Sequence, residues 1–321
     1  MPEVTVLMPV YNGMPFLPEA VDSILNQTLR DFTFLIINDG STDGSKEYLD
    51  RLDDPRLQVV HQPNQGLGAA LNSGLAMCKT EFIARMDSDD VSLPSRLKAQ
   101  LDFLHRHKDI GLVGTKFAYL GISGRSGFPP PAPQDHSTMY NDLIQGRQAL
   151  CHPSIMCRTS ILQSIGGYRI HSSGEDYDMF LRMGEATKLA NLNEVLYLYR
   201  LNPNSLSVKK FMEIREKYSY ACHCARLRSE GRPEVTLEEF AAEQSARPFW
   251  QRAAEAMDIY ALAQYRKALA EILGPHPVIG YARLALAAIS SPRWTAQRIS
   301  REIRKFTFTT EDTESTEKNE K

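Results

Sequence analysis

A long apolar run, a basic leader and an excess of charge of either sign are all missing from this sequence of 321 residues. The longest apolar stretch, 278–289, contains Arg283 and is shorter than the ~20 residues that a membrane-spanning helix needs. The opening run MPEVTVLMPV has no basic segment before it, so we expect no signal peptide. These absences predict a cytoplasmic protein without a transmembrane segment.

The charge balance and the cysteine content argue against a nucleic-acid-binding protein, a disulfide-stabilised protein and a zinc-knuckle protein. A formal net charge of −2 provides no global field that recruits nucleic acid, so an anionic ligand must be held by local groups. The five cysteines are an odd count, which favours reduced cytosolic thiols over a disulfide framework. Cys222-His223-Cys224 is spaced too tightly for a zinc knuckle, and no second pair accompanies it. We therefore interpret these three as ordinary helix residues.

Apolar runs that alternate with helical spacing organise the first half of the chain. The runs VTVLMPV, FTFLIIND, LQVVHQ and FIARMD predict buried strands at 4–10, 32–39, 57–62 and 82–87. The alternation predicts an α/β fold with a mostly parallel sheet flanked by helices. Ligands bind such sheets at the carboxyl ends of the strands, and the conspicuous polar clusters of this sequence follow those ends.

The later part of the chain changes character. Segment 125–136 is rich in proline and glycine, and a mobile flap over a site and a plain surface loop fit it equally. After Pro203 helical spacing predominates, and from about 309 the residues are polar and charged. The chain is too long for one small core. We predict an α/β domain over 1–205, a helical C-terminal region over 206–308 and a disordered tail over 309–321.

Three carboxylates within four residues follow the fourth predicted strand, in the order Asp87-Ser88-Asp89-Asp90. Like charges this close repel one another unless a cation lies among them. Asp87 and Asp89 can present oxygens to one hard divalent ion, which would neutralise a diphosphate. A turn that caps the helix after Pro94 explains the short pattern too. The position after an apolar strand favours the metal site.

Two further polar segments lie at predicted strand or helix ends. In NDGSTDGS at 38–45, small residues let backbone N–H groups approach a ligand, and Asp39 offers an acceptor to a base edge. It is neither a Walker motif nor a dinucleotide fingerprint, and a capped tight turn is compatible with it. Glu175 and Asp176 begin a helical stretch, where the helix dipole alone favours carboxylates. A general base also needs one exposed carboxylate with a second one nearby.

These segments, in this order, resemble the inverting GT-A-fold bacterial glycosyltransferases of family 2. VLMPVYNG at 6–13 and NDGSTDGS at 38–45 are similar to the two nucleotide loops of that family. NQGLGAALNSGL at 64–75 is similar to its base- and ribose-side helix, MDSDD at 86–90 to its metal motif, and GEDYDMFLR at 174–182 to its catalytic-base segment. The resemblance covers about 4–205 and implies a GT-A domain there.

The resemblance implies a role for each matching residue. Asp176 would deprotonate the acceptor hydroxyl, and Glu175 would assist acceptor binding. Asp89 would ligate Mg²⁺ or Mn²⁺ directly, and Asp87 would serve the metal, the ribose and the diphosphate. Asp39 would bind the uracil edge. The other donor-binding residues implied are Pro9, Tyr11, Asn64, Gly68, Asn72 and Ser88. An acceptor or phosphate region is implied at His152, Gly167, Tyr168, Arg200 and Asn202.

The implied reaction is one in-line displacement with inversion, from a nucleotide-sugar donor, most simply a UDP-sugar, to a hydroxyl of a glycan or lipid-linked glycan. Asn202 departs from the family pattern, because many relatives carry a metal- or diphosphate-binding histidine there. Asparagine still offers a carbonyl oxygen or an N–H to the diphosphate. A structural role fits Arg200 equally.

The end of the helical region carries basic and apolar residues in alternation. Between 293 and 306, five basic residues accompany one acidic residue, Glu302. Packing against the rest of the domain and peripheral contact with the inner face of the cell membrane both fit this pattern. The lipid-linked acceptors of the family favour the membrane contact.

Two other functions share parts of the pattern. A nucleotidyltransferase that forms sugar nucleotides needs a basic group in the loop after the first strand, and YNGMPFLPEA at 11–20 contains neither lysine nor arginine. A non-catalytic module that binds nucleotide sugars has no physical need for clustered carboxylates at Asp87, Asp89 and Asp176. Sugar transfer therefore remains the leading hypothesis.

Overall fold

The structure, a computed structural model, describes residues 2–121, 127, 133–169, 174–201, 210–274, 276–293 and 295–296. The chain divides into two compact units. One comprises Met1–Leu201 with Met212–Leu237, and the other comprises Asn202–Phe211 with Glu238–Lys321. The boundaries predicted at 205 and 308 stay predictions. Most of segment 125–136, most of 293–306 and the whole tail 309–321 lie outside the described residues.

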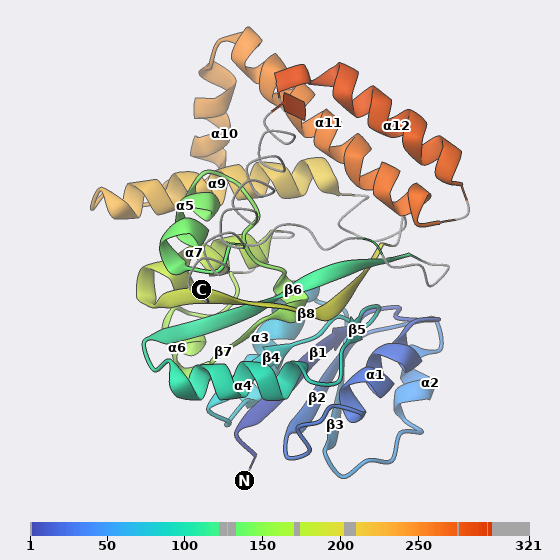
Figure 1. The fold of residues 1–321 in the computed structure, drawn as a ribbon. Helices are drawn as coiled ribbons and strands as arrows, with labels where there is room; N and C mark the ends of the chain where they lie inside the picture. The colour runs from blue at the N-terminus through green and yellow to red at the C-terminus, as the bar shows by residue number, and fades with distance from the viewer. Residues whose placement is uncertain are drawn as a thin grey trace, which may run out of the picture. The chain divides into compact units, whose positions relative to one another are not determined.

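An eight-stranded sheet forms the centre of the first unit, in the order β3-β2-β1-β4-β7-β6-β8-β5 (Figure 1). The strands are β1 (Val4–Val10), β2 (Thr33–Asp39), β3 (Leu57–Gln62), β4 (Phe82–Arg85), β5 (Val91–Ser92), β6 (Ile110–Gly121), β7 (Met156–Arg158) and β8 (Lys188–Leu201). The first four strands coincide with the four apolar runs. Strand β4 ends at Arg85, so the acidic segment leaves the sheet two residues earlier than predicted.

Parallel pairing dominates the half of the sheet that carries the polar loops. Strand β1 pairs in parallel with β2 and β4, and β2 with β3. Strand β7 is antiparallel to both β4 and β6, while β8 is parallel to β6 and antiparallel to β5. The predicted α/β class with a mostly parallel sheet is therefore confirmed, and the short strands β5 and β7 make the sheet mixed.

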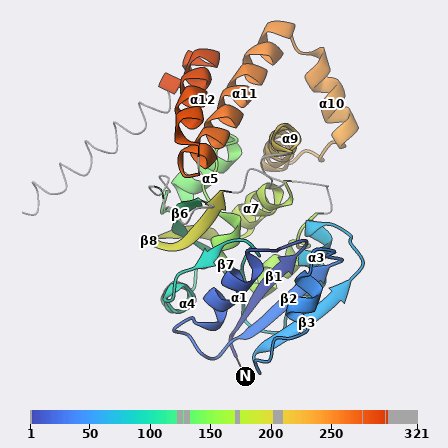
Figure 2. The same ribbon diagram turned by 90° about the vertical axis from the view of Figure 1, so that its right-hand side faces the viewer.

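Helices cover both faces of the sheet, as the continuous burial of β1 requires. Alternate residues of β1 face opposite cores: Val6 packs with α1 and α4, whereas Leu7 packs with α3 and the helices after β7. Figure 2 shows α1 and α4 on one side of the sheet and α3 on the other. The helices of this unit are α1 (Leu17–Leu25), α2 (Ser45–Leu49), α3 (Leu67–Met77), α4 (Arg96–Arg106), α5 (His136–Ile144), η1 (His152–Ser154), α6 (Thr159–Ser164), α7 (Glu175–Ala186) and, from Met212 on, α9 (Phe211–Ser229).

The second unit is helical, as predicted. It contains α10 (Leu237–Ala246), α11 (Phe249–Ile272) and α12 (Pro277–Ser290), and the last two lie side by side (Figures 1 and 2). Gly280 permits this contact, because a Cβ atom there would lie 2.6 Å from Ile272 Cγ1. Arg283 on α12 forms an ion pair with Glu271 on α11, with Nε and Oε1 2.8 Å apart. Among the described helices, none has both the length and the apolar character that crossing a bilayer requires.

Two buried polar side chains fix the segment around the carboxyl end of β4. Arg96 is fully buried and donates from Nη1 to the carbonyl oxygens of Arg85 and Pro153, each at 3.0 Å. Gln27 is also fully buried, donates to Leu93 O at 2.8 Å, and accepts from Leu97 N at 3.1 Å. The loop that carries the acidic residues is therefore held on both sides.

We expect Gln27→Leu to lower the free energy of unfolding by about 3 kcal/mol, because buried backbone groups left without partners cost about 1–3 kcal/mol each. Urea denaturation measures this change. Gln58→Leu is the control, since Gln58 is exposed on β3 and its replacement strands no buried group. Equal stability changes in the two variants would contradict the structural role of Gln27.

Candidate active site

The loops after β1 and β2 are tied together by hydrogen bonds. The Asn12 N–H donates to Ser41 Oγ at 3.0 Å, and Asn12 Oδ1 accepts from Thr42 N at 2.7 Å. Asn12 adopts φ 53°, a left-handed conformation that asparagine tolerates. Pro9 lies buried in β1, and the ring of Tyr11, predicted to lie beneath a base, is 52% exposed. The two loops therefore form one unit with an exposed aromatic side chain.

Asp39 lies at the carboxyl end of β2 with both carboxylate oxygens in use. Oδ1 accepts from Gln62 Nε2 at 2.7 Å and from Gln65 N at 2.9 Å. Oδ2 accepts from Gly66 N at 2.8 Å, which leaves it lone-pair capacity for a further donor. The carboxylate thus orders the turn before α3, and its predicted contact with a base stays a prediction.

Helix α3 connects the nucleotide-loop side of the unit to the segment before α7. Gly68 is close to Glu175, because a Cβ atom added at Gly68 would lie 3.9 Å from the Cβ atom of Glu175. Asn72 donates from Nδ2 to Tyr168 O at 2.6 Å and accepts from Tyr168 N at 2.9 Å. The Asn72 amide is therefore occupied in fixing Tyr168. Asn64 is exposed and lies beside Gly40.

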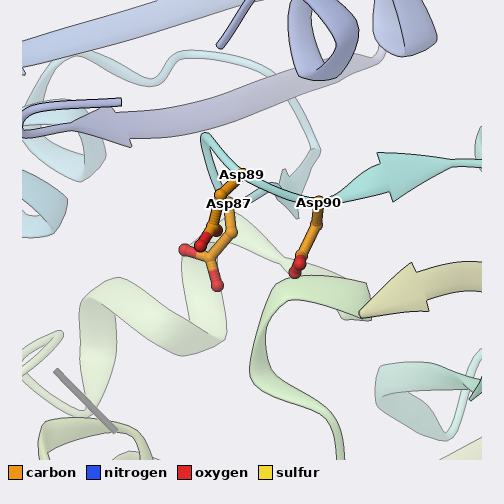
Figure 3. A group of neighbouring side chains, drawn as sticks. All are labelled: Asp87, Asp89 and Asp90. Carbon is orange, nitrogen blue, oxygen red and sulfur yellow. The ribbon is translucent and has the colours of Figure 1, made fainter. Parts of the chain in front are cut away.

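The acidic residues after β4 converge. One carboxylate oxygen from each of Asp87, Asp89 and Asp90 lies within 4.8 Å of the others. Figure 3 shows the carboxylates of Asp87 and Asp89 next to each other, with that of Asp90 apart from them. Ser88 lies between them on the turn, close to Gly13 of the first loop. The predicted pair, Asp87 and Asp89, is thus brought together.

Asp90 has a structural role that the sequence did not indicate. It is buried, accepts from the Tyr197 hydroxyl at 2.9 Å, and accepts from Arg200 N at 2.7 Å. Arg200 Nε donates to Asp89 O at 2.6 Å, and its guanidinium also pairs with Glu19. Strand β8 thereby clamps the acidic turn. Asn202, predicted to contact the diphosphate, lies outside the described residues.

The residues present fit a divalent cation. Burial, together with the charge of Asp87, raises the pKa of Asp89 to about 7. A hard cation between these two carboxylates would relieve both the desolvation and the repulsion, and carboxylate oxygens are the ligands that Mg²⁺ and Mn²⁺ prefer. Both carboxylate oxygens of Asp90 accept hydrogen bonds, whereas Asp87 uses Oδ1 for its ion pair with Arg85, so Asp87 and Asp89 would hold the ion.

A buried arginine faces these carboxylates from the last position of β4. Arg85 is 3% exposed and forms an ion pair with Asp87. Its positive charge also lowers the pKa values of Asp89, Glu175 and Asp176, against the burial that raises all three. One cation therefore acts on the acidic turn after β4 and on the carboxylates of α7.

Helix α7 begins with those two carboxylates. Its N-cap, Gly174, has φ 89°, and Glu175 and Asp176 form its first turn. Burial, followed by the charge of Asp176, raises the pKa of Glu175 to about 7. Burial likewise raises the pKa of Asp176, whose Oδ1 accepts from Tyr177 N at 2.8 Å. With a pKa of about 7, Glu175 is close to its titration at neutral pH, and the raised pKa of Asp176 is the direction that favours a general base.

Three of the five predicted acceptor-side residues, His152, Gly167 and Tyr168, lie together, whereas Arg200 lies at the acidic turn. The ring nitrogen Nε2 of His152 lies 3.0 Å from the Tyr168 hydroxyl, and both side chains are less than 10% exposed. Burial and the charge of Arg85 hold the pKa of His152 well below its usual value. Gly167, at φ 63°, lies so close to Asn72 that a Cβ atom would approach Oδ1 to 2.6 Å. This cluster contacts α7, because the His152 ring lies 5.8 Å from the Phe180 ring and Gly167 O accepts from Arg182 Nη2 at 2.8 Å.

Three residues at the site were missed by sequence reasoning. Arg85 left a signal, because it is the one charge in the apolar run FIAR, two residues before the first aspartate. Tyr197 and Tyr218 left none that separates them from ordinary core tyrosines. Tyr218 belongs to α9 and donates to Asp176 Oδ2 at 3.3 Å.

The sequence of this chain is similar to those of known glycosyltransferases. The sequence profile of the family described as Glycosyl transferase family 2 matches residues 5–166, which includes the acidic turn after β4 and ends before α7. The O-antigen biosynthesis glycosyltransferase WbnJ of Escherichia coli is 31% identical over 226 residues, which cover 68% of this chain and 87% of WbnJ.

Solved structures share the fold. S. aureus TarS 1-349 in complex with UDP-GlcNAc superposes with a TM-score of 0.55 at 17% identity, covering 89% of each chain. The mannosyltransferase PcManGT from Pyrobaculum calidifontis, in complex with GDP-Man and Mn²⁺, gives 0.50 at 16% identity and covers 91% of this chain and 87% of that one. The GT-A-type fold expected from the sequence is thereby confirmed. The family profile matches half of the chain, and the similarity to WbnJ extends over most of the length of WbnJ. This chain therefore belongs to glycosyltransferase family 2.

Proposed function

We propose that this glycosyltransferase moves a sugar from a UDP-linked donor, with inversion, to a hydroxyl of a glycan or lipid-linked glycan, and that it requires Mg²⁺ or Mn²⁺. The observation that carries the proposal is the position of Arg85. Its buried charge acts on Asp87 and Asp89 on one side and on Glu175 and Asp176 on the other. The charge of Asp87 also raises the pKa of Glu175, so the two acidic groups act on each other as well as on Arg85, which supports a reaction that uses both.

The residues of this chain divide the work between donor and acceptor. Asp87 and Asp89 would hold the divalent ion, which supplies charge stabilisation to the departing diphosphate. Asp176 would take the proton of the attacking hydroxyl through Oδ2, and Glu175 would orient the acceptor. The Asp39 carboxylate and the Tyr11 ring would bind the nucleobase.

The donor assignment draws on relatives. The TarS structures hold UDP and UDP-GlcNAc, whereas PcManGT holds GDP-Man, so the fold accepts either nucleotide. Asp39 presents an acceptor oxygen, which matches the N–H of uracil as well as those of guanine, so the UDP assignment rests on the UDP-bound neighbours and on the smaller size of a pyrimidine. The experiment that tests the function is release of UDP from UDP-sugars by the whole chain with Mn²⁺, against the same mixture with chelator.

Alternative functions and the membrane contact remain separate questions. A nucleotidyltransferase would release pyrophosphate from UTP and a sugar 1-phosphate and no UDP from a UDP-sugar, and a binding module would release neither product. The proposed contact of 293–306 with an anionic membrane surface concerns residues that lie mostly outside those described. Co-sedimentation with vesicles containing anionic lipid tests it independently.

We expect Asp89→Ala to abolish metal-dependent UDP release, because removing one direct ligand leaves the ion with too few oxygens and the diphosphate uncompensated. Mn²⁺ binding, followed by isothermal titration, should weaken in parallel. Asp102→Ala is the control, since Asp102 lies exposed on α4 in an ion pair with Lys98. Wild-type turnover in Asp89→Ala would overturn the metal assignment.

We expect UDP with Mn²⁺ to raise the melting temperature more than GDP with Mn²⁺ does. A ligand that binds only the native state stabilises it by about 2.7 kcal/mol at a hundredfold excess over Kd. A purine would have to be accommodated where Asp39 faces a pyrimidine edge. Equal shifts with the two nucleotides, measured by thermal denaturation, would rule out this mode of base recognition.

We expect Asp176→Asn to reduce UDP release from a UDP-sugar by roughly 10²–10⁴-fold, the contribution typical of a general base, while donor affinity changes little. Asparagine keeps the size of the side chain and caps a helix almost as well, so folding should be unaffected. Single-turnover release and UDP binding on one preparation measure both effects. Near-normal release would show that Asp176 serves only the helix.

A further inference from the structure

Helix α9 contributes a tyrosine to the carboxylate pair of α7. The Tyr218 hydroxyl lies 3.3 Å from Asp176 Oδ2 and 3.4 Å from Oδ1, so it is within hydrogen-bond distance of either oxygen. Oδ1 also accepts from Tyr177 N at 2.8 Å. The carboxylate thus has one partner on its own helix, Tyr177 N of α7, and one on α9, the Tyr218 hydroxyl.

The position of Tyr218 is fixed by packing. Its ring stacks on the Tyr177 ring with centroids 4.1 Å apart and an interplanar angle of 24°. Tyr177 is itself held, because its hydroxyl donates to Leu143 O at 2.6 Å. The guanidinium of Arg215, one turn earlier on α9, lies 5.5 Å from the Tyr218 ring centroid. These contacts anchor the ring on two sides.

The contact between α9 and α7 is also close at the backbone. A Cβ atom at Gly174 would approach the Cβ of Lys217 to 3.0 Å and Cδ1 of Tyr218 to 3.3 Å. Glycine at this N-cap therefore allows α9 to reach the first turn of α7. The hydroxyl of Tyr218 then meets Asp176 as a consequence of helix packing.

We propose that Tyr218 is a positioning residue, which holds the Asp176 carboxylate in the orientation from which Oδ2 takes the proton of the acceptor. The inference rests on the proposed function, in which Asp176 is the base. Of the two oxygens, Oδ1 is occupied by the strong bond from Tyr177 N. Oδ2 has the longer bond to Tyr218 and keeps a lone pair for the attacking hydroxyl.

Several charged or titratable groups surround Asp176. Glu175 neighbours it on α7, Arg85 acts from β4, Tyr168 lies before α7, and Lys217 and Tyr218 come from α9. Burial raises the pKa of Asp176, while the Tyr218 hydroxyl and the charge of Arg85 lower it. Removing the hydroxyl therefore raises that pKa further. The base acts when ionised, so activity is present above this pKa and is lost as the pH falls through it. In a variant without the hydroxyl, this loss should begin at a higher pH than in the wild type.

The test compares Tyr218→Phe with the wild type in UDP release from UDP-GlcNAc, UDP-glucose and UDP-galactose, with MnCl₂ and water as the acceptor. We expect kcat to fall about tenfold, as for loss of a hydrogen bond to a charged group. The acid limb of the kcat/KM profile should move to higher pH. UDP affinity and melting temperature should stay near wild-type, since phenylalanine retains the stack on Tyr177.

A matched control and a double variant separate the outcomes. Tyr140→Phe removes a hydroxyl that meets another carboxylate, Glu185 Oε1 at 3.5 Å, and should leave kcat and the pH profile unchanged. In the Asp176→Asn background, Tyr218→Phe should have little further effect, because its partner is already lost.

Two results would overturn the inference, and they differ. If Asp176→Asn is inactive but Tyr218→Phe keeps wild-type kcat and acid limb, the base stands and Tyr218 has no part in positioning it. If Asp176→Asn itself releases UDP at the wild-type rate, the proposed base fails, and the role of Tyr218 fails with it.

Discussion

The buried positive charge of Arg85 is the interaction on which the arrangement of the site depends. A guanidinium at the end of an apolar strand is costly to bury without partners, and its partner at contact distance is Asp87. The same charge offsets the desolvation of Asp89, Glu175 and Asp176. Arg200 also lowers the pKa of Asp89, but Arg85 acts on all four of these buried or half-buried carboxylates. The acidic turn after β4 and the first turn of α7 are therefore electrostatically linked.

Around this charge, segments far apart in sequence hold the acidic turn. Strand β8 supplies the Tyr197 hydroxyl and the Arg200 N–H to Asp90, so the third aspartate anchors the turn and leaves the first two available. Gln27 fixes the residues that follow. A rigid carboxylate pair costs no reorganisation when a ligand arrives, which is the condition for effective electrostatic stabilisation.

Whether a structural feature can be predicted from the sequence depends on how far apart along the chain the interacting residues lie. Strands β1, β2 and β4 were predictable because each is an almost continuous apolar run with buried residues on both faces, and the acidic turn follows directly from the last of them. Strand β3 is shorter in apolar residues and lies at the edge of the sheet, where Gln58 and His61 are exposed. Asn72 matched a donor-binding segment of the family, yet its amide is occupied by Tyr168, 96 residues away. Asp90 bonds to Arg200, 110 residues away, and Tyr218 reaches Asp176 from another helix. Periodicity and spacing are local properties, so they cannot identify such pairs.

In the proposed in-line displacement, the carboxylates after β4 act on the departing diphosphate and those of α7 act on the attacking hydroxyl. The most direct measurement is ¹H NMR of the first sugar released from an α-linked UDP-sugar in water, recorded before the anomers interconvert. Attack on the face opposite the leaving diphosphate predicts that the β-anomer appears first. Initial release of the α-anomer would contradict an in-line displacement and with it the division of work between the two acidic groups.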